Sequence, residues 1–408
     1  MHVLFLCDEY PPPVVGGIGQ VVRLLARGLV ARGHRATVAG QYWGDYREYD
    51  DEGVCVIKLS RPRKYRITRN EVSRRWLLAR VVHRLIRERD VDIVESPSYM
   101  GDGAFLKGYG KGSAFHILRS HGTDSVRAKV LGYRPRRFSR LLEQRALSRC
   151  DSLVLVGRGA GQDYLRILGR PDMPHVVIPN PIDTDSFRPL DLVDLDKTLL
   201  YIGRIDELKG AFALAKALPA VLEQFPDVRV RFAGAESYRE PGTGRSGSEV
   251  LCGFLEEDQQ KQLVFLGRLS HAQLIEEINR AAVCVLPSLS ENFPCAVLEV
   301  MSCARPVIGS RRAHGEEVLV HGESGLLVDP FDQHELSNAI IELLCDPERR
   351  RELGESARTL VEKRCSLDVV MAANIRYYES CLAAKPLTGE LLPLNDFRQT
   401  HQVEYIKS

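Results

Sequence analysis

The chain has 408 residues, of which 44% are hydrophobic and 27% are charged. This composition is typical of a folded globular protein and excludes a disordered chain, and the length corresponds to two or three domains at roughly 150 residues each. The apolar runs are strand-sized, well below the ~20 residues of a transmembrane helix. Because no basic stretch precedes an apolar one at the N-terminus, we expect no secretory signal and a cytoplasmic protein.

The net charge of +2 hides an uneven distribution. Residues 1–190 contain 32 Lys and Arg against 20 Asp and Glu, whereas the rest of the chain is acidic. Since no nucleic-acid-binding motif or interleaved aromatic platform is present, we expect the anionic partner to be a membrane surface or an acceptor instead of nucleic acid. A solvated helix face without a partner is the alternative reading. The basic residues are densest in two segments, which contain Arg61, Arg63, Lys64, Arg66, Arg69, Arg74, Arg75 and Arg134, Arg136, Arg137, Arg140.

In the first half, short β-rich runs alternate with helical patterns, as in a parallel sheet with crossover helices. Helices are predicted at Gln20–Arg32, Leu77–Arg89 and Phe138–Arg149. Strands are predicted at His2–Cys7, Ala36–Ala39, Val54–Leu59, Asp92–Glu95, Phe115–Arg119, Ser152–Val156 and Val176–Pro179.

Asn180-Pro181 and the acidic stretch after it interrupt this pattern, so we place a domain boundary at 188/189. A second α/β series occupies 189–367, a last helix at about 368–383 is expected to pack back on the first domain, and 384–408 reads as a tail. Two doubly wound domains in tandem predict a ligand cleft at the carboxyl ends of their strands. Strands of the second series are predicted at Thr198–Ile202, Arg229–Ala233, Leu263–Leu266, Val283–Leu286, Pro306–Ile308 and Gly325–Val328.

The loop after the first predicted strand contains Gly16, Gly17 and Gly19. Glycines let the backbone approach a ligand, and a helix start behind them favours an anion. The segment is not a dinucleotide fingerprint, because the third glycine and the acidic residue at the end of the second strand are missing. A plain tight turn is the alternative reading.

The second domain opens with a strand followed by Gly203-Arg204-Ile205-Asp206-Glu207-Leu208-Lys209-Gly210 and a helix from Ala211. Arg204 can hold phosphate oxygens with two parallel hydrogen bonds, and Lys209 adds a point charge at a helix N-terminus. A leaving nucleoside diphosphate needs such stabilisation. The alternative is a pair of surface charges flanking a turn.

The segment Ser290–Met301 carries two carboxylates around a helix start. Pro294 suits the first helical position, and Glu299 then falls in the second turn of a helix that is apolar on nearly all sides. A buried carboxylate is costly unless a group binds it, and a ribose diol could supply two donors. An ion pair with Arg305 is the alternative for Glu299, and Glu291 lies where it could hold sugar hydroxyls.

Strand ends of the first domain supply further candidates. His121 follows one predicted strand in Arg119-Ser120-His121-Gly122, although a lone histidine is more often structural. Glu95 and Tyr99 lie in the Glu95-Ser96-Pro97-Ser98-Tyr99 loop, where we expect acceptor specificity.

Taken together in this order and spacing, these segments resemble the retaining glycosyltransferases of the GT-B fold, specifically glycosyltransferase family 4. The resemblance runs over about 1–383, and includes the hinge from Ile178 to Phe187 and the His321-Gly322-Glu323-Ser324-Gly325 segment. It implies an α/β, GT-B fold of two Rossmann-like doubly wound domains that face each other across a cleft.

The resemblance also implies roles. Arg204 and Lys209 would bind the diphosphate, Glu299 the ribose, and Glu291 and His121 the donor sugar. Phe293, Pro294, Cys295 and Ala296 would present backbone groups to the sugar and the phosphates. Gly16 and Gly17 of the first domain would bind the donor, with Gly17 approaching its phosphates. Loops near Gly234 and Arg268 would border the base. Two departures from the family pattern are Pro294, where glycine is usual, and Ala313-His314, where a glycine pair is expected.

The predicted reaction moves a sugar from a UDP- or GDP-sugar to an acceptor hydroxyl with retention of configuration, in glycan, glycolipid or polysaccharide synthesis. We expect no cofactor and no metal: the 10 cysteines form no CxxC pair, and two cations can neutralise the diphosphate. The enzyme is expected in the cytoplasm, peripheral on the inner face of the membrane. A sugar-nucleotide epimerase, a phosphorylase or a non-catalytic nucleotide-sugar-binding protein are the alternatives, which an assay for acceptor-dependent nucleoside diphosphate release would separate.

Overall fold

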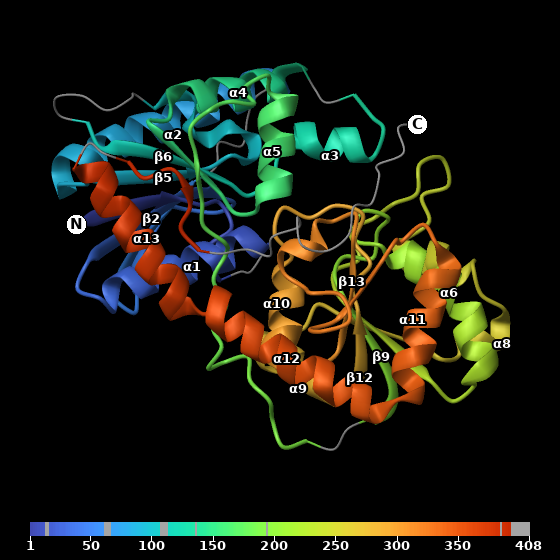
Figure 1. Cartoon of the computed structure of the whole chain (residues 1–408). Coiled ribbons are helices and arrows are strands. Elements are labelled where there is room, and N and C mark those ends of the chain that lie inside the picture. Colours follow the sequence, from blue (N-terminus) through green and yellow to red (C-terminus); the bar gives the residue numbers. More distant parts are fainter. Residues whose placement is uncertain are drawn as a thin grey trace. The chain divides into compact units, whose positions relative to one another are not determined.

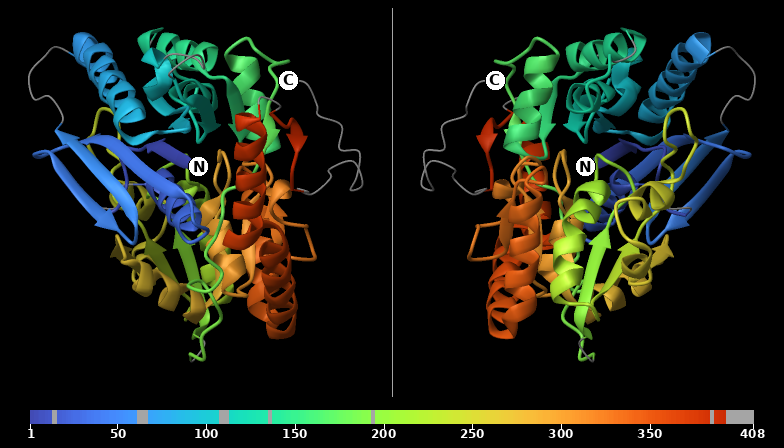
Figure 2. Two further views of the ribbon diagram at one scale, coloured as in Figure 1. Left: turned by 90° about the vertical axis from the view of Figure 1, so that its left-hand side faces the viewer. Right: turned by 90° about the vertical axis from the view of Figure 1, so that its right-hand side faces the viewer.

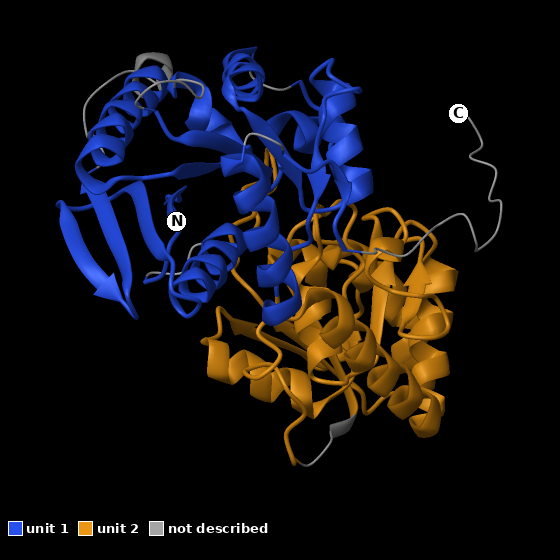
Figure 3. Ribbon diagram, turned by 60° about the vertical axis from the view of Figure 1, so that its left-hand side comes forward, with its two compact units in different colours: residues 1–181, 367–392 blue, residues 182–366, 393–408 orange. Residues whose placement is uncertain are grey.

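The structure is a computed structural model that describes residues 1–12, 16–60, 67–106, 113–134, 137–192, 195–383 and 386–392, with backbone alone for 67–70 and 195–196. Two compact units divide the chain (Figures 1 and 3): unit 1 comprises Met1–Pro181 and Leu367–Leu392, and unit 2 comprises Ile182–Ser366. The division lies a few residues before the expected 188/189 boundary. The last helix, expected to return to the first domain, belongs to unit 1.

Unit 1 is built on a nine-stranded sheet in the order β15-β8-β7-β6-β5-β1-β2-β4-β3. The strands are parallel except β3, which pairs antiparallel with β4 at one edge (Figure 2). The strands are β1 (His2–Leu6), β2 (Arg35–Tyr42), β3 (Arg47–Asp51), β4 (Val54–Ser60), β5 (Ile93–Pro97), β6 (Phe115–Ser120), β7 (Ser152–Leu155), β8 (Val176–Val177) and β15 (Gly389–Glu390). The helices are α1 (Gly17–Val30), α2 (Ile67–Arg89), the 3-10 helix η1 (Tyr99–Phe105), α3 (Asp124–Val130), α4 (Arg137–Arg149), α5 (Arg158–Ile167) and α13 (Leu367–Leu382).

Two parts of unit 1 differ from the sequence prediction. Arg47–Asp51, a polar segment without alternation, forms an edge strand because Val54–Ser60 offers it a partner. Gly389–Glu390, in the segment predicted as a tail, pairs with Val176–Val177 and extends the sheet. In both cases backbone pairing with a neighbouring strand outweighs weak local signals.

A buried polar network fastens α13 to the sheet of unit 1. Arg119 donates from Nε to Glu95 Oε1 at 2.7 Å and from Nη2 to Asn374 Oδ1 at 2.6 Å. The Tyr378 hydroxyl donates to Glu95 Oε2 at 2.7 Å. All four side chains are buried, so the Glu95 carboxylate is engaged inside the unit. We therefore withdraw the acceptor-side assignment of Glu95.

The basic segments of unit 1 are less exposed than their charge count suggests. Arg74 pairs with Asp8 and Asp102, and Arg75 pairs with Glu71; both arginines are buried. They contribute to the interior of the unit and not to a cationic surface. Other members of the predicted cluster lie outside the described residues or have only their backbone described: Arg61, Arg63, Lys64, Arg66, Arg69 and Arg136.

Unit 2 is built on a six-stranded, fully parallel sheet in the order β11-β10-β9-β12-β13-β14. Its strands are β9 (Leu195–Ile202), β10 (Arg229–Ala233), β11 (Leu263–Gly267), β12 (Ala281–Val285), β13 (Val307–Ser310) and β14 (Leu326–Val328). Its helices are α6 (Ala211–Gln224), α7 (Gly247–Cys252), α8 (Glu257–Gln260), α9 (His271–Arg280), α10 (Cys295–Ser302), the 3-10 helix η2 (Gly315–Glu317), α11 (Gln333–Cys345) and α12 (Pro347–Cys365).

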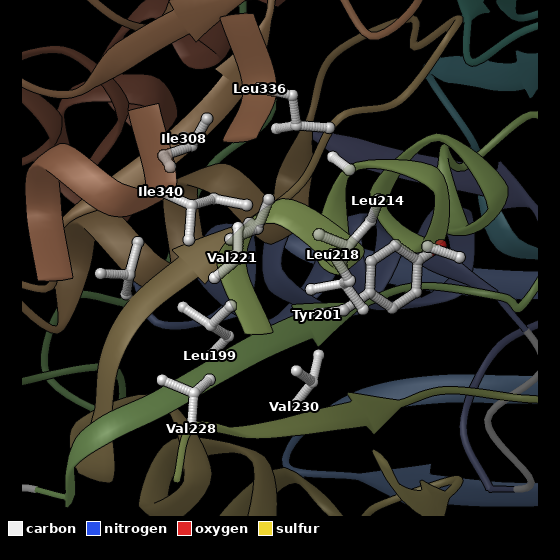
Figure 4. Close-up of a cluster of buried hydrophobic side chains, with 14 of the residues drawn as sticks. Leu199, Tyr201, Leu214, Leu218, Val221, Val228, Val230, Ile308, Leu336 and Ile340 are labelled. Atoms are coloured by element: carbon white, nitrogen blue, oxygen red, sulfur yellow. The ribbon is translucent and has the colours of Figure 1, made fainter. Parts of the chain in front are cut away.

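The core of unit 2 lies between the sheet and its helices. Leu199 and Val230 of the sheet meet Leu214 and Leu218 of α6, and Ile340 of α11 completes the cluster (Figure 4). These side chains are fully buried, and each contributes roughly 1.5–3 kcal/mol of transfer free energy. This packing holds β9 and α6 rigidly, and with them the loop that joins the two elements.

The strand order of unit 2 places a topological switch point at β9. The chain leaves β9 for β10 and β11 on one side, and then returns to β12 on the other side. Ligands of doubly wound sheets bind outside the carboxyl ends of the strands at such a point. A ligand site is therefore expected at the loops after β9 and β12. Among the described residues, no helix is long and apolar enough to cross a bilayer.

Candidate functional site

The loop after β9 is held in one conformation by glycines and a buried tyrosine. Gly210 has φ +74, and a Cβ there would overlap the carbonyl oxygen of Pro287, so the position demands glycine. The fully buried Tyr201 donates its hydroxyl to the carbonyl oxygens of Arg204 at 2.7 Å and Lys209 at 3.1 Å. Tyr201 thus fixes the backbone at both predicted phosphate-binding residues.

The predicted cations and the first carboxylate meet at the switch point. Lys209 donates from Nζ to Glu291 Oε1 at 2.6 Å, and the Ser288 hydroxyl donates to the same oxygen at 2.9 Å. Burial opposes the charge of Arg204, but Asp206 and Glu291 outweigh it and raise the pKa of the guanidinium. The loops after β9 and β12 therefore form one charged cluster.

Sequence reasoning missed Asp206, although it lies inside the predicted clamp segment. Its Oδ2 accepts from Arg204 Nε at 2.8 Å, and its Oδ1 accepts from the backbone N–H of Lys209 at 2.9 Å. Asp206 is buried, so it orients Arg204 while it closes the turn. Aspartate is favoured in turns because its side chain accepts from a nearby backbone amide, so an aspartate between β9 and Gly210 was a signal in the sequence.

Glu299 lies in the second turn of α10, directly after the Glu291 loop. Its side chain is half-buried, and burial raises the pKa of its carboxyl to about 7. Burial is the cause of this shift, and no charge of a neighbouring arginine contributes to it. The shift gives no sign of the ion pair with Arg305, and the ribose role of Glu299 stays a prediction.

The helix start itself differs slightly from expectation. Pro294 is the residue before α10 and not its first residue, while Cys295 begins the helix. Phe293 and Pro294 are buried, and Cys295 and Ala296 are half-buried. Of the first amides of α10, that of Cys295 donates to the Phe293 carbonyl oxygen and that of Val297 to the Pro294 carbonyl oxygen, each at 2.9 Å. A role of these amides toward phosphate or sugar oxygens stays a prediction.

Two further loops of the same sheet edge follow β10 and β11. Gly234 lies so close to Gly203 that a Cβ would overlap the Gly203 carbonyl oxygen, and its N–H donates to Gly267 at 2.8 Å. Arg268 follows Gly267 and is exposed. Gly234 therefore borders the loop that carries Arg204, while Arg268 lies at the same sheet edge one strand further away.

In unit 1 the remaining candidates also lie at strand carboxyl ends. Gly16 and Gly17 stand at the start of α1 after β1, Tyr99 opens η1 after β5, and His121 follows β6. A Cβ at Gly16 would meet the Glu9 carboxylate, whereas Gly17 has open space around it. Burial, with Arg119 adding to it, lowers the pKa of His121 to about 3, so its imidazole is neutral near pH 7. Tyr99 is 45% exposed.

Two family models match successive parts of the chain. The model described as Glycosyltransferase Family 4 matches residues 15–186, and the model described as Glycosyl transferases group 1 matches residues 183–360. Glycogen synthase of Mycobacterium tuberculosis is 25% identical, over 96% of this chain and 97% of its own length. The chain belongs to glycosyltransferase family 4.

Solved structures show the fold. Sucrose-phosphate synthase from Thermosynechococcus elongatus has a TM-score of 0.79 at 22% identity, over 94% of this chain and 99% of that one. Anabaena HepE, solved with UDP and glucose, has a TM-score of 0.69 at 14% identity, over 93% of this chain and 99% of that one. The family 4 glycosyltransferase described here therefore has the GT-B fold.

One departure from the family pattern coincides with an unusual backbone conformation in this glycosyltransferase. His314, where a glycine is expected, adopts φ +54 in the left-handed region. Such a conformation is unfavourable for a residue with a side chain. The backbone shape expected of glycine is thus kept, and an imidazole is added beside η2.

Nucleotide binding by this glycosyltransferase is predicted to depend on pH through Glu299. A ribose diol donates to the ionised carboxylate, so affinity should rise as pH rises through about 7, the pKa of the free protein. Between about pH 6 and about pH 8 the ionised fraction grows roughly tenfold, and Kd should fall by a similar factor. Calorimetric titration with UDP and GDP at several pH values measures this change in Kd.

The control is Glu299→Gln, which keeps the shape and removes the titration. Its remaining pH dependence belongs to the phosphates of the nucleotide. Equal pH profiles for wild type and Glu299→Gln would contradict a ribose role for Glu299. The same variant should gain stability without nucleotide, because a raised carboxyl pKa lowers folding stability as pH rises from the unfolded value through about 7.

Proposed function

We propose that this glycosyltransferase moves a hexosyl group from a UDP- or GDP-sugar to an acceptor hydroxyl with retention of configuration, in the synthesis of a glycan, glycolipid or polysaccharide. The observation that carries the proposal is the convergence of Arg204, Lys209 and Glu291 at the switch point of the unit 2 sheet. Two fixed cations there can take up the charge of a departing diphosphate.

In the proposed reaction, the bond from the anomeric carbon to the β-phosphate oxygen breaks, and its electron pair leaves with the nucleoside diphosphate. Arg204 and Lys209 stabilise that charge. The acceptor oxygen bonds to the anomeric carbon on the face from which the diphosphate departs, which retains the configuration. Its proton passes to an oxygen of the departing β-phosphate, so that no protein carboxylate has to act as a nucleophile.

The other residues are proposed to position the donor. Glu299 accepts from the ribose hydroxyls, Glu291 holds the sugar, and the amides at the start of α10 hold phosphate or sugar oxygens. Arg268 borders the base, while His121 and Gly17 of unit 1 serve the sugar and the phosphates. Since two cations oppose the diphosphate, we propose that the transfer needs neither a cofactor nor a metal ion.

Relatives support the reaction class. Glycogen synthase is named for polymer synthesis, and the HepE structure holds UDP and glucose. We propose a UDP-sugar as the first donor to test, with a GDP-sugar as the second. We also propose that the enzyme is cytoplasmic and associates peripherally with an anionic membrane, for which exposed arginines of unit 1 such as Arg80, Arg137 and Arg140 supply the positive charge.

The test is transfer from UDP-glucose and GDP-mannose to glucose oligosaccharides and to a lipid extract, with and without EDTA. Release of nucleoside diphosphate should depend on the acceptor and persist in EDTA, and proton NMR should find the anomeric configuration of the donor in the product. Release independent of every acceptor would favour a binding protein or an epimerase. Loss of transfer in EDTA would overturn metal independence alone.

A further inference from the structure

The loop between β2 and β3 presents two aromatic side chains to solvent. Trp43 is 72% exposed, the largest exposed fraction among the large apolar side chains that the structure describes, and Tyr46 is 55% exposed. Since β2 is parallel to its neighbours, this loop lies at the same edge of the sheet as the loops of Gly17, Tyr99 and His121. Single exposed apolar side chains are normal, but two on one short loop at a ligand-binding edge indicate an interaction site.

Hydrogen bonds hold this loop at both of its ends. Where β2 ends, the Tyr42 hydroxyl donates to the Cys7 carbonyl oxygen at 2.6 Å. At the other end, the Tyr46 hydroxyl donates to Glu48 Oε2 at 2.7 Å, and Arg89 Nη2 donates to Glu48 Oε1 at 2.6 Å. The bonds from Arg89 and Tyr46 lower the pKa of Glu48 to about 2, so the carboxylate that orients Tyr46 stays ionised. A ring that is already oriented loses little conformational freedom when a ligand covers it.

The charge around the two rings selects among ligands. Residues 44–53 contain five Asp and Glu and one Arg. Even with Arg23, Arg27 and Arg89, which pair with carboxylates of this segment, the positive charges of this surface do not outnumber the negative ones. Such a surface disfavours a nucleic acid or an anionic membrane as its partner. The exposed carboxylates of the segment are Asp45, Glu48, Asp50 and Glu52.

A sugar ring matches this combination of aromatic and acidic groups. One face of a pyranose carries C–H groups with weakly positive hydrogens, and an aromatic ring presents its negative face to them. The sugar hydroxyls can donate to carboxylates, and hydrogen bonds to a charged acceptor are stronger than those to a neutral one. A hydrocarbon chain would leave the carboxylates without donors. A basic peptide could also use both kinds of group, but the proposed transfer reaction gives a role to a sugar alone.

We propose that Trp43 and Tyr46 bind a sugar unit of a carbohydrate acceptor, with the sugar ring stacked on Trp43 and its hydroxyls donating to carboxylates of residues 44–53. The inference rests on the proposed function, and it names the acceptor as an oligosaccharide or polysaccharide where that proposal leaves a lipid open. Trp43 is a specificity-determining residue in this assignment and takes no part in breaking the donor bond.

The first test is binding of the full chain, without nucleotide, to an array of hexose, hexosamine and uronic acid oligosaccharides. We expect the wild type to bind at least one of them, Trp43→Ala to weaken that binding roughly tenfold, and Trp43→Phe to retain most of it. Trp76→Ala is the matched control, since Trp76 is 48% exposed on α2, and it should bind as wild type. Absence of binding to every oligosaccharide, or equal binding by Trp43→Ala, would overturn the proposal.

Tryptophan fluorescence locates the bound sugar. The chain has two tryptophans, so Trp76→Phe leaves Trp43 as the sole emitter. The oligosaccharide that binds should shift this emission to shorter wavelength, because the sugar displaces water from the indole. In Trp43→Ala, where Trp76 is the sole emitter, the same titration should give no shift. A shift in Trp43→Ala and none in Trp76→Phe would place the sugar elsewhere and contradict the assignment.

A transfer assay separates this inference from the proposed function. Trp43→Ala should raise the acceptor KM roughly tenfold and leave kcat and the donor KM near their wild-type values. Oligosaccharide binding without any transfer would leave the platform in place and refute the proposed reaction. Transfer to a lipid acceptor with no oligosaccharide bound would do the reverse. Binding of octalysine that Trp43→Ala weakens, with no oligosaccharide bound, would identify a basic peptide as the partner and overturn the sugar assignment.

Discussion

Lys209→Ala is expected to lower kcat for sugar transfer by roughly 10²–10³-fold, the usual loss when one group that stabilises developing charge is removed. Lys209 is one of two cations beside the proposed leaving diphosphate, and it holds Glu291 at 2.6 Å. Because the charge on the diphosphate grows as the sugar departs, the loss should fall mainly on kcat. Steady-state kinetics with UDP-glucose or GDP-mannose measures it, and Arg204→Ala should behave in the same way.

The matched control is Lys197→Ala. Lys197 is on the same unit, is paired with Asp227, and is 55% exposed. A surface ion pair of this kind contributes little to stability, so this variant should retain normal turnover. Near-normal kcat in Lys209→Ala, with its fold intact by circular dichroism, would contradict the diphosphate assignment and with it the central part of the proposed reaction.

Glu95→Ala should destabilise unit 1 by about 3–5 kcal/mol, because it leaves the buried Arg119 guanidinium without its carboxylate partner. Glu95 and Arg119 are 3% and 1% exposed, and the pair connects the sheet to Asn374 and Tyr378 of α13. Urea denaturation measures the loss. The amides of α13 should lose their protection first, and hydrogen exchange would detect this loss.

The double variant Glu95→Leu/Arg119→Met is the control for this prediction. Replacing both charges by apolar groups of similar size removes the unpaired charge, so it should recover most of the stability. A Glu95→Ala variant with unchanged stability and a raised acceptor KM would instead restore the acceptor role that its strand-end position first indicated.

The sequence by itself determined the architecture and the donor loops. Strand and helix periodicity predicts both parallel sheets. The residue types of eight consecutive positions, from Gly203 to Gly210, predict a phosphate-binding turn. Gly210 adopts positive φ and packs against Pro287 as a glycine-specific position must. These features depend on local conformational preference, which neighbouring residues set.

Only the tertiary structure decided which side chains become partners. The Tyr378 hydroxyl reaches Glu95 across 283 residues, and Arg74 reaches Asp102 from a different element. The sequence placed Glu95 at an acceptor loop and the arginine on a basic surface, because burial and pairing are invisible in residue order. A charge or an apolar side chain acquires its role from the atoms packed around it, and chain folding brings those atoms from distant positions.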